Sequence, residues 1–122
     1  MAVILIVEDD AFIRVIAERM MQGCGHQTLS TDDVDAALVL LRSPQPIDVL
    51  FTDIRLQTAA LAGFELARAA IELRPKLRVL YTTGAPLSGE MKALFVESAR
   101  FLAKPYVHEQ LQASVEDLLA VP

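Results

Sequence analysis

Four apolar segments of the sequence end in side chains that can carry out chemistry. The first ends in Glu8 and Asp9, the second in Asp53, the third in Thr83 and the fourth in Lys104. Three carboxylates that lie close together repel one another and raise each other's pKa values, and a bound cation relieves this repulsion. Oxygen ligands without His or Cys suit Mg²⁺, which takes one or two carboxylates and keeps several waters. If the four segments end at one place, the sequence predicts an Mg²⁺ site beside Lys104.

The same side chains are also suited to phosphoryl transfer. A carboxylate such as Asp53 can act as a nucleophile and form an aspartyl phosphate. Lys104 and the metal would neutralise charge on the transferring oxygens, Thr83 offers a hydroxyl, and Gly84 leaves room for the phosphoryl group. Alternatively, the acids only cap helices. That interpretation explains Asp10, which opens the first predicted helix, but it leaves the placement of Thr83 and Lys104 unexplained.

Apolar runs and helical patterns alternate along the whole chain. We expect strands at residues 2–7, 26–29, 48–52, 77–82 and 100–103, and helices at 10–21, 34–41, 62–73, 90–96 and 107–119. This alternation predicts an α/β fold of the (βα)₅ type, a doubly wound parallel sheet with right-handed crossovers. Ligands of such folds bind at the carboxyl ends of the strands. With the flavodoxin-like strand order 2-1-3-4-5, the four reactive ends belong to neighbouring strands.

The composition limits the class of protein. A chain of 122 residues fits a single domain over residues 1–122. Its 11 basic and 16 acidic residues give a net charge of −5, without the basic block that direct nucleic-acid binding requires. Cys24 is the only cysteine, which excludes an intramolecular disulfide. The longest apolar run is too short to span a membrane and lacks the features of a signal peptide, so we expect a soluble cytoplasmic protein.

Four segments of the sequence resemble the receiver domains of two-component response regulators. They are residues 4–9 (ILIVED), 48–53 (DVLFTD), 79–84 (VLYTTG) and 101–106 (FLAKPY). Each motif is weak alone, but the four are specific together, and they match in order and spacing over essentially the whole chain. The resemblance implies that Asp53 is the phosphoacceptor, that Asp9 binds Mg²⁺ or its substitute Mn²⁺ directly, and that Glu8 acts through metal-bound water. It also implies that the backbone carbonyl of Arg55 completes the protein's share of the coordination.

The resemblance further assigns the groups that sense phosphorylation. Thr83 is the expected switch hydroxyl, with Gly84 beside it, and Phe101 is the expected switch aromatic. Lys104 is the expected phosphate partner. The family's Lys–Pro bond is typically cis, which we carry over to Lys104–Pro105, although only about 5–6% of X–Pro bonds in folded proteins are cis.

The loop between Asp53 and Gly63 departs from the family pattern. It is one or two residues longer than the commonest form, and it lacks the proline often found soon after the phosphoacceptor. Arg55 also places a charged side chain beside the site, where it either contacts phosphate or Glu8 or is simply solvated.

The resemblance implies a phosphorylation switch, not a turnover enzyme. A histidine kinase or histidine phosphotransfer protein would phosphorylate Asp53, and the added charge would change the surface of the fourth helix, fifth strand and fifth helix. That surface would then meet a downstream protein. Because the chain ends at Pro122, soon after the last predicted helix, we expect a stand-alone receiver that is monomeric or dimerises on phosphorylation.

Two other functions fit parts of the sequence. A small haloacid-dehalogenase-like phosphatase also uses an aspartate at the end of a strand. However, Arg55 stands where that family has its second aspartate, and a cap or extra length would be needed. A protein-interaction module of the same fold would need no phosphorylation, but the acidic cluster and Lys104 argue against it.

Overall fold

The computed structural model describes residues 1–57 and 59–120, so that Thr58 of the lengthened loop and Pro122 lie outside it. Its strands are β1 (Val3–Val7), β2 (Gln27–Thr31), β3 (Val49–Asp53), β4 (Arg78–Thr83) and β5 (Arg100–Ala103), and its helices are α1 (Ala11–Gly23), α2 (Val34–Arg42), α3 (Ala62–Leu73), α4 (Gly89–Lys92) and α5 (His108–Ala120). All strand pairs are parallel, in the order β2-β1-β3-β4-β5. The predicted (βα)₅ fold and strand order are confirmed.

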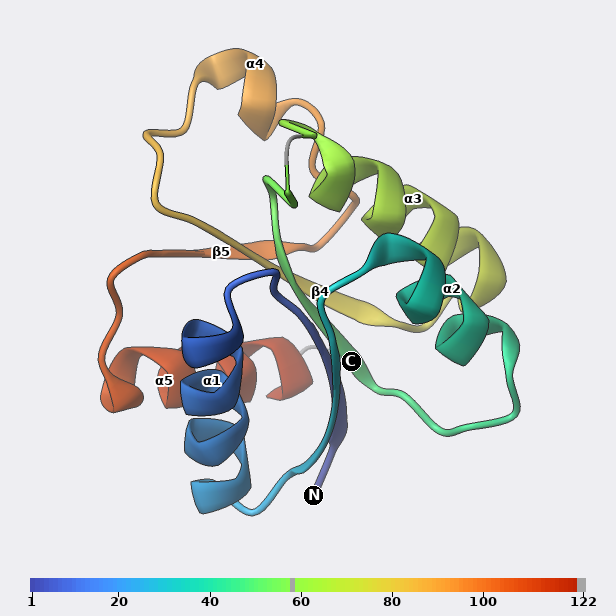
Figure 1. Ribbon diagram of the computed structural model, residues 1–122, viewed down its shortest axis with the longest axis vertical. Helices are drawn as coiled ribbons and strands as arrows, with labels where there is room; N and C mark the ends of the chain where they lie inside the picture. Colours follow the sequence, from blue (N-terminus) through green and yellow to red (C-terminus); the bar gives the residue numbers. More distant parts are fainter. Residues whose placement is uncertain (58, 121–122) are drawn as a thin grey trace.

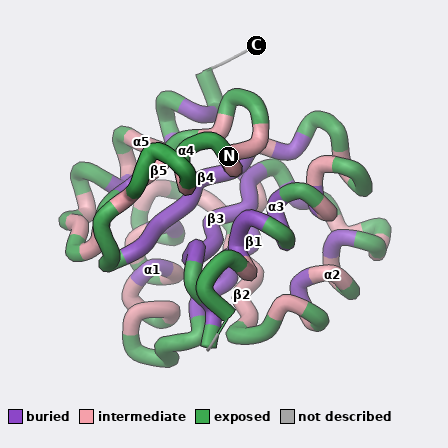
Figure 2. The backbone as a smooth tube through the Cα atoms, turned by 90° about the horizontal axis from the view of Figure 1, so that it is seen from above, coloured by how far each residue is buried: buried purple, intermediate pink, exposed green. Residues whose placement is uncertain are grey.

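The sheet separates two layers of helices (Figure 1), with α1 and α5 on one face and α2 and α3 on the other. Ile4 and Ile6 of β1 pack with α1 and α5, whereas Leu5 and Val7 pack with α2 and α3. All four side chains are at most 1% exposed, and burying each contributes about 1.5–3 kcal/mol. Burial on both faces makes β1 a central strand, and the central strands are the most buried part of the chain in Figure 2. β2, the predicted edge strand, contains no buried residue.

Three of the helices begin at polar side chains that cap them. The Asp10 carboxylate accepts hydrogen bonds from the N–H groups of Phe12 and Ile13 at 2.9 and 3.0 Å. It therefore opens α1, as predicted. Asp33 caps α2 and Ser88 caps α4 in the same way. In the part of the chain that the structure describes, no helix is long and apolar enough to cross a membrane.

The predicted helix over residues 90–96 is too long. The observed α4 spans only Gly89–Lys92, and the chain continues in turns. Phe95 packs instead against Tyr81, with ring centroids 4.7 Å apart, and the Val96 N–H donates to the Tyr81 hydroxyl at 3.1 Å. These contacts with β4 replace the bonds that a longer helix would make.

Candidate functional site

The parallel register brings the predicted side chains to one edge of the sheet. Asp53 pairs with Thr82 of β4, and Thr83 pairs with Ala103 of β5. Carboxylate oxygens of Glu8, Asp9 and Asp53 all lie within 4.8 Å of one another. These three acids form the acidic site, and strand order alone is enough to bring them together.

Lys104 joins two of the three acids. Its Nζ lies 2.6 Å from Glu8 Oε1 and 2.8 Å from Asp53 Oδ2. Burial alone lowers the pKa of Lys104, but its hydrogen bonds to Asp53 and Glu8 outweigh burial and raise that pKa above its ordinary value. The lysine is therefore a permanent cation beside Asp53, and it balances only part of the acidic charge.

Glu8 and Asp9 are neighbours with opposite environments. Glu8 is 4% exposed, and burial raises its pKa to about 7, against the opposing effects of Lys104 and of the Asp10 N–H. Asp9 is exposed. Some burial raises its pKa, but the hydrogen bond from the Gln57 N–H helps to hold it below the ordinary value. Asp9 is thus a carboxylate at neutral pH, whereas Glu8 titrates near it.

Gly63 allows the backbone after Asp53 to pass close to α3. The Ile54 N–H donates to the Thr82 carbonyl at 2.9 Å, and the Gly63 N–H donates to the Ile54 carbonyl at 2.8 Å. A Cβ at position 63 would lie 2.2 Å from the carbonyl oxygen of Asp53. Only glycine fits this approach, so residue 63 helps to fix the position of Asp53.

The donor set of the acidic site fits Mg²⁺. It consists of three carboxylates without His or Cys, two of them buried, and their charge exceeds that of Lys104. Glu8, Asp9 and Asp53 are the residues that would hold the ion. The Arg55 side chain is exposed, and both ion pairs found in the described residues belong to Lys104. The considered contact between Arg55 and Glu8 is therefore not formed.

The two threonines at the end of β4 are both buried but differ in their partners. Thr83 Oγ1 accepts a hydrogen bond from the Ala85 N–H at 3.2 Å. Thr82 Oγ1 is buried without a hydrogen-bond partner among the described residues. Thr82 pairs directly with Asp53, but it was given no role of its own from the sequence. Because side chains alternate along a strand, the two neighbouring threonines lie on opposite faces of the sheet.

The remaining predicted residues lie at the ends of β4 and β5 and on β5. The Lys104–Pro105 bond is cis, as expected, and a Cβ on Gly84 would meet only the Lys104 Cβ at 4.0 Å. Phe101 is half-buried, with its ring centroid 6.4 Å from that of Phe95. Tyr106, which directly follows Pro105, was given no role from the sequence. Its ring contacts Phe51 edge-on at 6.0 Å, and burial raises its pKa to about 12.

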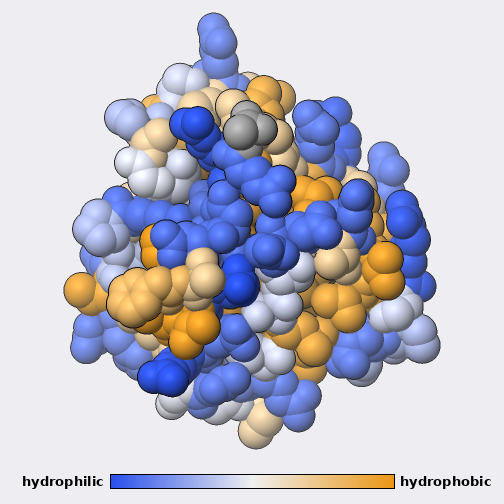
Figure 3. Space-filling model, in the orientation of Figure 1, coloured by the Kyte–Doolittle hydropathy of each residue, from blue (hydrophilic) through white to orange (hydrophobic). Residues whose placement is uncertain are grey.

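Apolar side chains lie next to the acidic site. A hollow of about 410 Å³ is lined by Ile13, Ile16 and Met20 of α1 and by residues 84 and 104–106. Figure 3 shows apolar side chains gathered over α1, where Phe12 is 75% exposed. The rim of the site therefore offers apolar surface to an approaching protein.

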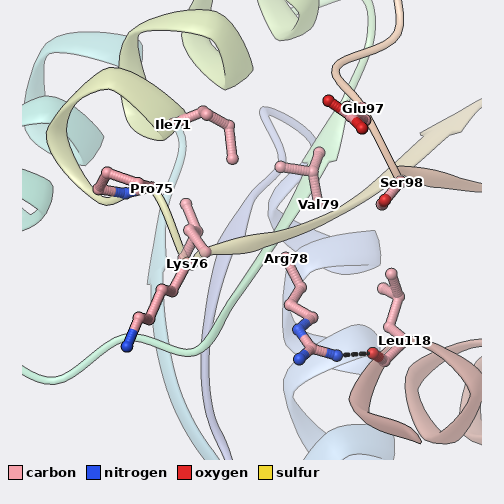
Figure 4. Close-up of a pocket in the computed structure, with 9 residues that line it drawn as sticks. Ile71, Pro75, Lys76, Arg78, Val79, Glu97, Ser98 and Leu118 are labelled. Carbon is pink, nitrogen blue, oxygen red and sulfur yellow. Dashed lines mark hydrogen bonds between the residues drawn. The ribbon is translucent and has the colours of Figure 1, made fainter. Parts of the chain in front are cut away.

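A second hollow, of about 560 Å³, lies at the opposite, amino end of β4. Figure 4 shows Lys76, Arg78, Glu97 and Leu118 among the residues that line it. None of the predicted site residues reaches it, so this hollow is separate from the acidic site.

Comparisons with known proteins point to one family. The family model described as response regulator receiver domain matches residues 4–116. Over 117 residues the chain is 29% identical to the response regulator receiver protein CpdR of Brucella abortus (strain 2308), covering 95% of each. It is also 29% identical to the DNA-binding transcriptional regulator NtrC of Salmonella typhimurium, matching 93% of this chain but 24% of that protein. A response regulator receiver protein from Sinorhizobium medicae WSM419 has a similar structure, with a TM-score of 0.89, 28% identity and coverage of 98% and 95%.

Proposed function

This chain belongs to the response regulator receiver domain family, and we propose that Asp53 is its phosphoacceptor. Receivers are phosphorylation-regulated signalling domains of two-component systems, not turnover enzymes, and aspartyl phosphate and Mg²⁺ are characteristic of the family. The observation that carries the proposal is the buried Asp53 carboxylate, with Lys104 Nζ at 2.8 Å and two further acids beside it. A plain structural ion pair would not need the extra acids.

The proposed reaction transfers a phosphoryl group from a protein histidine to Asp53. A carboxylate oxygen of Asp53 forms the new P–O bond, the P–N bond of the phosphohistidine breaks, and the imidazole nitrogen keeps the electron pair. Lys104 turns from the carboxylate to the phosphoryl oxygens and balances their charge. Glu8, Asp9, Asp53 and the Arg55 carbonyl would hold Mg²⁺, which when bound supplies further charge neutralisation at these oxygens.

The readout begins at Thr83. Its oxygen accepts from the Ala85 N–H, which leaves the hydroxyl proton available for a phosphoryl oxygen beside Gly84. Phosphorylation adds about −1.5 to −2 charge and three acceptor oxygens, enough to draw this hydroxyl toward Asp53. Phe101, which is half-buried on the neighbouring strand, then turns into the space that Thr83 leaves. As a result, the populations of the conformers of the α4–β5–α5 surface shift.

The position and charge of the site support the proposed partners. A histidine kinase or histidine phosphotransfer protein must approach over the rim formed by α1, and a downstream protein reads the α4–β5–α5 surface. A net charge of −5 supports protein partners over nucleic acid. One sheet and its helices account for the described residues, which supports a single domain. We further propose that this domain, over residues 1–122, is cytoplasmic and either monomeric or dimeric on phosphorylation.

Intact mass measured after incubation with Mg²⁺ and acetyl phosphate tests this function. We expect one phosphoryl adduct per chain, absent in Asp53→Asn. Repeated hydrolysis of a generic phosphomonoester would instead indicate a phosphatase. If neither an adduct nor Mg²⁺ binding is found, the chain is an interaction module of the same fold.

A further inference from the structure

The lengthened loop after β3 makes one direct contact with the acidic site. The backbone N–H of Gln57 donates to Asp9 Oδ2 at 2.7 Å, across 48 positions of the chain. This bond ties one of the two oxygens of the Asp9 carboxylate to a distant segment of the chain, and it restricts the rotation of an exposed side chain.

The backbone around Gln57 is held in an unusual conformation. Gln57 has a φ of 56°, in the left-handed region that costs a residue other than glycine roughly 1–2 kcal/mol. The turn is closed by Leu56 and Ala59, whose N–H groups each donate to the other's carbonyl at 3.2 and 3.0 Å. The Leu56 side chain is 3% exposed. The strained residue is therefore anchored on one side by the core and on the other by Asp9.

We propose that the Gln57 N–H is a positioning group for the metal ligand Asp9, which it holds in the orientation that accepts the ion. The inference rests on the proposed function, because it takes Asp9 as a ligand of Mg²⁺. A hydrogen bond from N–H to a charged carboxylate is among the strong ones, and a ligand oriented before binding loses less freedom on binding. A proline at position 57 has no N–H and cannot make this bond.

The test removes this N–H alone and measures Mg²⁺ affinity by calorimetric titration of the full chain. Replacing residue 57 by the α-hydroxy acid of glutamine turns its N–H into an ester oxygen. Groups that orient metal ligands typically change affinity by about 10–100-fold, and we expect a loss of about tenfold. The α-hydroxy acid at Ala59 is the matched control, because it perturbs the same turn without touching Asp9. Gln57→Gly is a second control that keeps the N–H and relieves the left-handed strain.

The outcomes separate this inference from the proposed function. Weaker binding in the residue-57 ester, with both controls within about twofold of the parent, supports the positioning role. Equal affinity of parent and ester, or an equal loss in the Ala59 ester, overturns it and leaves the function standing. A parent chain that binds no Mg²⁺ overturns both. Hydrogen exchange of the Gln57 amide without metal gives an independent readout: it should be slow in the parent and faster in Asp9→Ala, and no difference would overturn the role.

Discussion

The two ends of the sheet use their charged side chains in opposite ways. At the amino end, Arg74 donates to the carbonyls of Leu41 and Ser43 at 3.0 and 2.8 Å, and Arg78 donates to the carbonyl of Leu118. These cations satisfy the last carbonyls of helices, which is a structural task. At the carboxyl end, three acids meet one lysine and the charge stays unbalanced. Charge that the fold itself does not satisfy marks the end of the sheet where we propose that phosphorylation takes place.

The largest expected effect is on phosphorylation when the lysine is removed. In Lys104→Met, Asp53 and Glu8 keep their positions but lose the cation, and the rate of adduct formation from acetyl phosphate should fall about 100-fold. Arg78→Met is the matched control at the amino end. It should lower the free energy of unfolding by about 1 kcal/mol and leave the rate unchanged. Intact mass against time measures both rates. Similar rates in the two variants would contradict a special role of Lys104 at the carboxyl end of the sheet.

Close approach of the backbone at the carboxyl end gives the next effect. In Gly63→Ala, the new Cβ would overlap the Asp53 carbonyl, so we expect a loss of about 3 kcal/mol in the free energy of unfolding. Gly89→Ala is the control, because a Cβ there meets no atom within 4 Å, and its change should stay within about 0.5 kcal/mol. Chemical denaturation measures both. If Gly63→Ala leaves the free energy of unfolding unchanged, the loop after Asp53 can move to make room for the new Cβ.

Titration of the acidic site should make stability depend on pH. The pKa of Glu8 is about 7 in the folded chain and 4.5 ordinarily, so the folded state binds the proton more tightly. Stability should therefore fall by about 2 kcal/mol as pH rises from about 4.5 to about 7 in the metal-free protein. The pKa of Asp9 is lowered, so the titration of Asp9 changes stability only at pH values below this window. The pKa of His26 is also lowered, so the unfolded chain binds that proton more tightly. The titration of His26 therefore makes stability rise with pH, below about pH 6.5.

Denaturation at several pH values compares the parent with Glu8→Gln, which lacks this titration but keeps His26. The difference between the two chains isolates the effect of Glu8. Saturating Mg²⁺ should reduce that difference, since the ion favours the ionised acids. If the free energy of unfolding depends on pH in the same way in both chains, the raised pKa of Glu8 is contradicted.

Much of the fold and the core of the candidate site could be predicted from local pattern and topology. β1 ends just before Glu8 and Asp9, β3 ends at Asp53, and β5 ends just before Lys104. Parallel strands in one order leave their ends few possible arrangements. The length of α4 could not be predicted, because the contact of Phe95 with Tyr81 depends on packing between distant segments. The Gln57–Asp9 bond was also missed. It depends on a backbone angle that the residue type does not favour.

The smallest expected effect concerns the approach of the protein donor. Phe12 is 75% exposed and lies three residues after Asp9, so a donor that reaches Asp53 should contact it. Phe12→Asp should slow phosphotransfer from the cognate phosphohistidine protein about tenfold, in the range of a moderate interface residue. The rate from acetyl phosphate should not change, because the small donor needs no protein contact. Val39→Asp is the matched control, because Val39 is an exposed apolar residue of α2. Equal slowing with both donors would place Phe12 in the chemistry of the carboxyl end and not on its docking rim.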